Sequence, residues 1–347
     1  MTTEQRAAEA DKVSVAFHVA LAQLGAATLE DALDIWAGMP PTATARAASS
    51  WLNQAIRLIM LRRGQARALA TAYYRLVRAL RTGRTVPDPR KPEPAMVSLA
   101  MLRREFNSLA GAEQPLEGGE RPDPVTAGDA PAEDRIPVEK LDGDSAAEAA
   151  RLERLAEQEA RIDLEALGPD NLAAKVEKID TEAPAKEVDA ARDQAHKEAG
   201  LRQASATERI VMDGARGTIW NYAQRDRRVI GWVRLSRTGT PCGWCAMLIS
   251  RGFVRKGDLY SSKRAAEYSD GDKYHDNCHC YAEPVYEGQR DTSPLYELNR
   301  RYAKQWPEVT KGLSGKAALT AWRRFIRQEQ QLAQEASRSQ AQEASSA

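Results

Sequence analysis

Apolar side chains along the first hundred residues recur at the spacing of an amphipathic helix. The clearest set falls at intervals of three and four residues, on one helix face: Leu69, Tyr73, Leu76 and Leu80. Thr82 and Gly83, followed by Pro87 and Pro89, predict where this helix ends. We therefore predict a helical N-terminal domain over residues 1–110.

The pattern changes twice in the middle of the chain. From residue 111 to 150 there are five prolines, five glycines and eleven acidic residues. Little can be buried there, so we expect residues 111–145 to form an acidic, disordered linker. Residues 146–203 are rich in Ala, Glu, Arg and Lys, with a thin apolar stripe. This composition is typical of a charged helical segment, which Pro169 and Pro184 are expected to interrupt.

Strand patterns appear only in the last third of the chain. Residues 229–235 alternate in side-chain direction, and residues 281–286 predict a returning strand with Pro284 at a sheet edge. Helical patterns surround them, at 205–227, 296–305 and 316–330. We predict an α+β domain over residues 204–330 and a disordered, Gln- and Ala-rich tail over residues 331–347.

Residues 41–84 contain nine arginines and no acidic residue. The arginines are Arg46, Arg57, Arg62, Arg63, Arg67, Arg75, Arg78, Arg81 and Arg84. One interpretation is a solvated helix face, in which the arginine stems cover apolar surface. The alternative is a contact face for DNA, RNA or an acidic protein surface.

The length and net charge of the whole chain constrain its function only weakly. Its 347 residues suggest about two domains, and a formal net charge of +1 gives no global field that favours nucleic acid or a membrane. The chain shows no run of 18 apolar residues and no secretory signal, so we expect no transmembrane helix and no membrane partner. We also expect the chain to mature in a reducing cytoplasm, where clustered cysteines are more often metal ligands or redox groups than disulfides.

All four cysteines and two of the four histidines lie between positions 242 and 280. The spacing is Cys242-x2-Cys245, then 29 residues, then His275-x2-Cys278-x-Cys280. A Cys-x2-Cys pair lets two sulfurs bind one ion from a single turn, and the distant group completes a tetrahedron. The pattern predicts a structural zinc knuckle. Free buried cysteines, two disulfides and a redox Cys-x-x-Cys are the alternatives.

The cluster contains more candidate ligands than one tetrahedral ion needs. The candidates are Cys242, Cys245, His275, Cys278 and Cys280. Four thiolates make a closed site, and a Cys3His site that uses His275 is the alternative. We exclude His279, because its side chain would point to the opposite face of an extended segment. The predicted fold class is therefore mainly α, with a small α+β zinc-knuckle domain that follows a helical domain and an acidic Pro/Gly linker.

Two strings around these cysteines carry a family resemblance. They are RTGTPCGWCAMLISRGFV (237–254) and YHDNCHCYAEPVYE (274–287). Together they resemble the C-terminal motif of the phage Mu F-like minor head proteins, in the actinobacteriophage branch. The N-terminal string ATAYYRLVRALRTGRTVPDP (70–89) is similar to that branch as well.

The resemblance implies a minor capsid protein that acts in phage head morphogenesis. Such proteins associate with the portal protein, enter the procapsid in few copies and can leave the head with the DNA. The implied partners are the portal protein and the major capsid or scaffolding protein. DNA is a further candidate partner, through the arginine-rich N-terminal helix. The implied location is the interior of the virion head, after assembly in the host cytoplasm, and the expected cofactor is Zn²⁺.

Two other functions stay open. Relatives in this branch are often labelled capsid maturation proteases, but the chain contains no Gly-x-Ser-x-Gly and no His-Glu-x-x-His motif. His18 lies in an apolar helical pattern that tolerates a histidine, His196 lies in a charged one and is expected to be solvated, and His275 is already a candidate metal ligand. We therefore predict no catalytic residue. A nucleic-acid-binding zinc protein is the third function, because an arginine-rich helix and a zinc knuckle both occur in such proteins.

Overall fold

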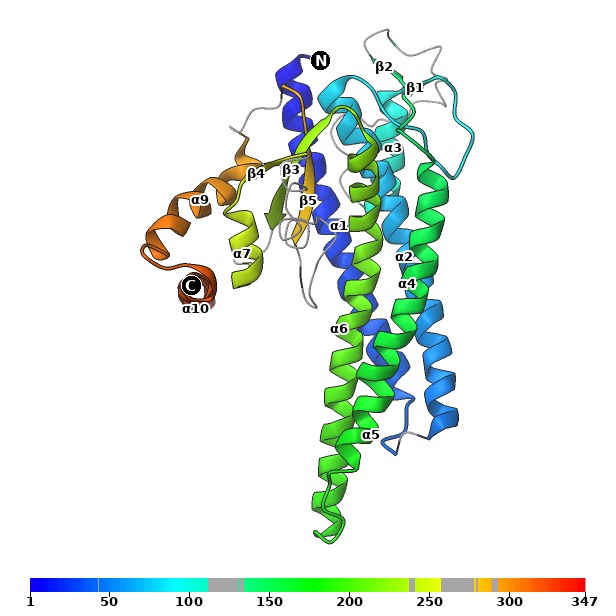
Figure 1. Cartoon of the computed structure of the whole chain (residues 1–347), viewed down its shortest axis with the longest axis vertical. Coiled ribbons are helices and arrows are strands. Elements are labelled where there is room, and N and C mark those ends of the chain that lie inside the picture. The colour runs from blue at the N-terminus through cyan, green and yellow to red at the C-terminus, as the bar shows by residue number, and fades with distance from the viewer. Residues whose placement is uncertain are drawn as a thin grey trace. The chain divides into compact units, whose positions relative to one another are not determined.

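The computed structural model describes residues 1–42, 44–111, 131, 134–236, 241–256, 278, 280–288 and 293–346. It is mainly helical with two small sheets, as Figure 1 shows, which confirms the predicted fold class. The chain divides into two compact units. We call residues Met1–Asp226 the helical unit, and the described residues from Arg227 onward the cysteine unit.

Long helices that lie side by side build the helical unit (Figure 1). They are α1 (Thr3–Ala37), α2 (Ala45–Thr82), α4 (Ser145–Glu165) and α6 (Ala185–Arg225). The shorter elements are α3 (Leu99–Ala110), the π turn η2 (Ala166–Asp170) and α5 (Asn171–Val176). The predicted N-terminal helices are therefore present, and α6 packs against both α1 and α2.

The apolar face predicted around Tyr73 lies in the core of the helical unit. Leu69, Tyr73, Leu76 and Leu80 are each at most 4% exposed. Phe17 of α1 stacks on Tyr73, with ring centroids 4.1 Å apart. Helix α2 ends at Thr82 because Gly83 adopts a left-handed conformation with φ of 70° and donates its N–H to the Ala79 carbonyl. Both the buried face and the end of this helix are confirmed.

Helix α1 is long and apolar enough, by length and composition, to cross a membrane. The core helix of a soluble bundle meets the same criteria, so packing has to decide. In the structure α1 buries Val13, Phe17, Leu21 and Trp36, each at most 2% exposed, and it contacts α2 and α6. That one-sided burial is what a helix in a bundle core shows.

The arginines of α2 do not share one solvated face. Arg63, Arg75 and Arg78 are at most 6% exposed. Other elements supply their carboxylate partners: Arg63 pairs with Glu153, Arg75 with Glu93 and Glu105, and Arg78 with Asp226 and Glu139. For these three arginines both interpretations from the sequence are wrong, because they form internal ion pairs. Arg46 and Arg57 are exposed.

Part of the segment expected to be a disordered linker forms a strand. Strand β2 (Arg135–Pro137) pairs antiparallel with β1 (Met96–Ser98), and Ile136 is 1% exposed. The Thr85 N–H donates to the Pro137 carbonyl, which ties β2 to the chain beyond α2. Burial of Ile136 and backbone pairing with β1 hold this acidic stretch in a defined position. Residues 112–130 and 132–133 of the expected linker lie outside the described residues.

The domain boundary expected at residues 203 and 204 falls inside a helix. Helix α6 runs without a break from Ala185 to Arg225, and the unit boundary lies at Asp226. Pro184 precedes α6, as predicted, whereas Pro169 lies within the π turn η2 and does not end the helical path. The charged segment therefore belongs to the helical unit, where α4 and α6 pack together.

The cysteine unit combines a small sheet with short helices. Its elements are β3 (Val229–Ser236), α7 (Gly243–Ile249), β4 (Phe253–Arg255), β5 (Cys280–Tyr286), the 3-10 turn η3 (Pro294–Tyr296), α9 (Glu297–Val309) and α10 (Gly315–Ser346). The sheet order is β4-β3-β5, and both pairings are antiparallel. Pro284 lies in the edge strand β5, as predicted from its missing N–H donor.

Helix α10 is longer than the sequence suggested. The prediction placed a helix over residues 316–330 and a disordered tail over 331–347. In the structure the helix continues to Ser346. Ala, Gln and Glu make up ten of the 16 residues 331–346 and favour helix, and the stretch contains no Gly or Pro that would stop α10 at residue 330. Residues 331–339 are exposed, in keeping with their polar composition.

Candidate metal centre

Two segments of the cysteine unit hold the four cysteines. Cys242 is the N-cap of α7, and its Sγ accepts a hydrogen bond from the Cys245 N–H at 3.4 Å. Cys245 lies in the first turn of the same helix. Cys280 is the first residue of β5, and Cys278 precedes it by two positions. The helix and the edge strand thus bring together cysteines that are more than 30 residues apart in sequence.

Three of the sulfurs form a compact triangle. The Sγ atoms of Cys245 and Cys278 are 3.4 Å apart, those of Cys278 and Cys280 are 3.0 Å apart, and those of Cys280 and Cys245 are 3.3 Å apart. The three residues are at most 4% exposed. Four sulfurs at about 2.3 Å from one tetrahedral ion would lie about 3.8 Å from each other. The observed spacings of 3.0–3.4 Å are shorter than that value, but each is nearer to it than to the roughly 2.05 Å of a disulfide.

This triangle contains three of the five predicted ligands. Cys245, Cys278 and Cys280 lie close enough to hold a metal ion between them. Cys242 is less buried and lies beside the triangle, where its thiol contacts Cys245. His275 and the excluded His279 lie outside the described residues. A fourth ligand from Cys242 or His275 would complete the tetrahedron.

The crowding of the thiols strongly disfavours ionisation of Cys245. Hydrogen bonds with the thiols of Cys242, Cys278 and Cys280 raise the pKa of Cys245, and burial raises it further. Metal ligation needs thiolates, and a bound cation supplies the positive charge that lets several of them lie together. The clustered thiols are therefore better suited to bind a thiophilic metal ion than to ionise together without one.

Sequence reasoning missed a buried arginine beside this cluster. Arg234 of β3 is 8% exposed, and its Nε donates to the Cys280 Sγ at 3.2 Å. Partial burial lowers the pKa of Arg251, and the positive charge of Arg234 lowers it further. The positive charge of Arg234 favours a thiolate at Cys280. The sequence feature that could have indicated this residue is an arginine inside a strand whose other residues are mostly apolar.

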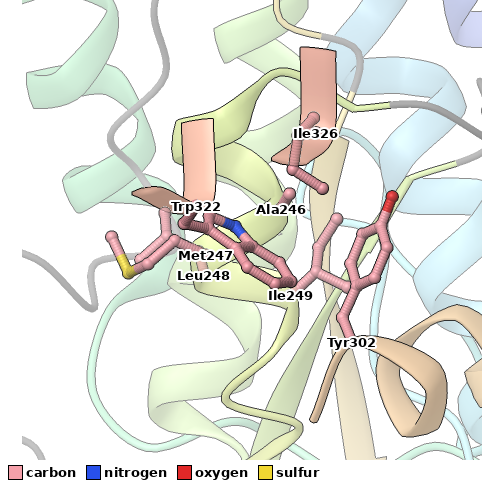
Figure 2. Packing of buried hydrophobic residues seen from close by; sticks show 7 residues of the cluster. All are labelled: Ala246, Met247, Leu248, Ile249, Tyr302, Trp322 and Ile326. Atoms are coloured by element: carbon pink, nitrogen blue, oxygen red, sulfur yellow. The ribbon is translucent and has the colours of Figure 1, made fainter. Parts of the chain in front are cut away.

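A hydrophobic cluster fixes helix α7, and with it Cys245. Figure 2 shows Ala246, Met247, Leu248 and Ile249 of α7 packed with Tyr302, Trp322 and Ile326. Trp322 is fully buried, and the ring of Tyr302 meets it edge-on with centroids 5.5 Å apart. Asn299 adds polar bonds, since its side-chain amide donates to the carbonyls of Arg234 and Ile249. Helices α9 and α10 thereby position Cys245 through α7.

The other two histidines belong to the helical unit. His18 is 3% exposed in α1. His196 was expected to be solvated, but its ring stacks on Trp36 at 5.2 Å and its Nε2 lies 2.7 Å from the Met39 carbonyl oxygen. The backbone carbonyl of His196 also accepts the Trp36 indole N–H at 3.0 Å. His196 therefore packs α6 against α1 instead of facing solvent.

The comparisons with known proteins give one match. Residues 145–308 match the family described as VG15 protein. The matched segment runs from the start of α4 into α9 and includes all four cysteines. This match suggests a phage-encoded protein. No curated protein matches the chain, and no solved structure does.

Proposed function

We propose that this chain is a minor head protein of a phage, with a structural role in head assembly next to the portal, and that its cysteine cluster holds a zinc ion. One observation carries the proposal. Three cysteine sulfurs from two distant segments meet in the interior of the unit that bears the Mu F-like sequence motif. The match of residues 145–308 to the VG15 protein family supports a phage origin independently of those distances.

Zinc is the metal that this donor set suits best. Thiolates are soft ligands that select Zn²⁺, Cu⁺ or iron–sulfur clusters, and a closed tetrahedral set of cysteines is typical of structural zinc. The ion would join α7 to β5 in a unit whose described residues form a sheet of three strands. Binding free energies of about 10–16 kcal/mol for structural zinc make this a large contribution to folding.

A structural role fits the burial of the cysteines better than catalysis does. A nucleophilic cysteine needs an accessible thiolate and a nearby base. Cys245, Cys278 and Cys280 are all buried and contact one another. We therefore propose a non-enzymatic head component, located inside the head in few copies, with the portal protein and the major capsid or scaffolding protein as partners.

Metal analysis tests the zinc site. The full chain, purified without chelator, should contain about one zinc per chain by inductively coupled plasma mass spectrometry. Cys245→Ser should lose that zinc. Cys242→Ser and His275→Ala, measured in parallel, identify the fourth ligand as the residue whose replacement lowers the zinc content. A metal content near zero in the wild-type chain, or iron in place of zinc, would contradict the proposal.

Mass spectrometry of purified phage particles tests the head role. The chain should be present, in full length, in fewer copies than the major capsid protein. It should also copurify with the portal protein from cells that assemble procapsids. Absence from particles would contradict a minor capsid role. A folded Cys278→Ser variant that only loses cleavage of a capsid precursor would favour the capsid maturation protease instead.

A further inference from the structure

The first half of helix α10 carries cations and no acidic residue. From Gly315 to Gln328 it contains Lys316, Arg323, Arg324 and Arg327 and no acidic residue. All four cations are exposed. In the part of the chain that the structure describes, none of the four forms an ion pair. The buried arginines of α2 differ in this respect, because acids from other elements neutralise them.

Two of these arginines line a groove between α10 and the start of α7. The groove has a volume of about 510 Å³. Cys242, Gly243 and Trp244 form one wall, and Thr320, Arg323, Arg327 and Gln330 form the other. The four residues of α10 fall at intervals of three and four, so they share one face of the helix. No acidic side chain is among the described residues that line this groove.

The groove is a built feature of the cysteine unit. A methyl group at Gly243 would lie 2.7 Å from Cγ and 3.1 Å from Cα of Arg323, so only glycine allows α10 to approach this closely. The Gln330 side-chain amide donates to the Pro241 carbonyl at 3.3 Å, which ties α10 to the segment before α7. These contacts hold the two arginines beside Trp244.

We propose that this groove binds single-stranded nucleic acid through its phosphate backbone. Guanidinium groups bind phosphate oxygens in bidentate fashion, and Arg323 and Arg327 are about 6 Å apart along the helix axis. Trp244 is half-buried, because it packs partly against the hydrophobic cluster around Trp322. It also lines the same groove, where the exposed part of its ring offers a stacking surface for a base. This assignment moves the candidate nucleic-acid contact from α2 to α10, and it is independent of the proposed head role.

Fluorescence anisotropy with a labelled 20-nucleotide oligo-dT tests this assignment. The probe is titrated with the full, zinc-loaded chain over a series of salt concentrations. Arg323→Gln with Arg327→Gln should weaken binding about tenfold or more. The slope of log affinity against log salt should fall by roughly 1.4, since each phosphate contact on a single strand contributes about 0.7. The matched control, Arg46→Gln with Arg57→Gln, removes two exposed charges from α2 and should stay within twofold of wild type.

Trp244 is tested separately, with Trp244→Phe as the variant that keeps a ring. Trp244→Leu should lower the affinity about fivefold or more without changing the salt slope, because stacking releases no counterions. Trp244→Phe should retain most of the affinity. Zinc content and far-UV circular dichroism confirm that each variant is folded. Wild-type affinity in the Trp244→Leu variant would overturn the stacking surface.

Three outcomes would overturn the nucleic-acid assignment. The first is wild-type affinity in the double arginine variant of α10, and the second is an equal loss in the α2 control, which would mean that only net charge matters. The third uses poly-L-glutamate as a competitor. If it binds the groove as tightly as the oligonucleotide and the double variant loses both, the groove binds acidic peptides in general.

Discussion

At the scale of a single residue, Arg78 shows why a run of arginines in the sequence does not predict their exposure to solvent. Its guanidinium donates to both carboxylate oxygens of Asp226, at 2.6 and 3.1 Å, to the Thr85 carbonyl and to Glu139. The Tyr74 hydroxyl donates to the same Asp226 carboxylate at 2.9 Å. These groups come from three stretches of chain: α2 with the residues directly after it, the segment after β2, and the end of α6. A side chain that looked like a solvated cation is therefore a buried junction of the helical unit.

Replacing Arg78 should destabilise the helical unit strongly. Arg78→Met leaves Asp226, which is 1% exposed, as a buried carboxylate without its main cationic partner. Breaking a buried pair in this way costs about 3–5 kcal/mol. Arg84→Met is the matched control, because Arg84 is 46% exposed and its pair with Glu139 is worth about 1 kcal/mol or less. The midpoint of urea unfolding, followed by circular dichroism, measures both, and equal shifts would contradict the prediction.

Arg234 should control how tightly the cysteine centre binds metal. Partners that hydrogen-bond to a metal ligand typically change metal affinity 10–100-fold, so Arg234→Met should weaken zinc binding by about that factor. Arg255→Met is the control, because Arg255 is exposed on strand β4 of the same sheet. Competition against a chromophoric chelator gives both affinities. Unchanged affinity in the Arg234 variant would show that its bond to Cys280 does not tune the site.

At the scale of elements, two glycines of α6 should respond to alanine in opposite directions. A methyl group at Gly200 would lie 2.5 Å from Cδ1 of Trp36, so Gly200→Ala forces α6 away from α1 and should destabilise the chain by about 1–3 kcal/mol. Gly217 has nothing within 4 Å of an added methyl, so Gly217→Ala should stabilise by about 0.5–1 kcal/mol. Urea unfolding measures both, and the same sign in both variants would contradict this packing.

Sequence patterns predicted those helix ends and strands that a few neighbouring residues specify. The end of α2 follows from Gly83, strand β3 follows from alternation around Trp232, and strand β5 follows from the returning run 281–286 with Pro284 at a sheet edge. Helix α7 was missed because seven residues between Cys242 and Ser250 are too few to show a helical period. The position of the boundary at Asp226 was missed because it depends on packing of α6 against α1 and α2.

The residues of the candidate metal centre also differ in whether the sequence alone could predict them. The clustering of Cys245, Cys278 and Cys280 could be predicted, because cysteine spacing is itself the signal. Arg234 could not, because its contact with Cys280 arises only when β3 pairs with β5. Sequence spacing therefore identified cysteines that lie together, whereas the sheet register determined which charged group lies beside them.

At the scale of the whole molecule, the net charge of +1 conceals two different kinds of arginine-rich helix. In the helical unit, acids from α4, α6 and the β1–β2 region neutralise the buried arginines of α2. In the cysteine unit, α10 exposes Arg323, Arg324 and Arg327, which form no ion pair with any described residue. Surface electrostatics that attract an anionic partner are therefore expected in the cysteine unit, although the sequence shows more arginines in α2.

The division into two compact units predicts how the chain responds to metal removal. Each unit has its own core, and the cysteine centre lies wholly in the second unit. A chelator should therefore unfold the cysteine unit, because a metal that joins α7 to β5 contributes directly to its folding. The helical unit should persist, since its buried ion pairs and apolar core need no metal.

Limited proteolysis with and without chelator checks this response. With chelator, trypsin should degrade the chain from Arg227 onward and leave a protected fragment that ends near Arg225, because trypsin cleaves after exposed basic residues once a region unfolds. The control is chelator saturated with zinc beforehand, which should leave the digestion pattern of the untreated chain. Loss of both units together would mean that they fold cooperatively. An unchanged pattern would mean that the hydrophobic cluster around Trp322 holds the cysteine unit without metal.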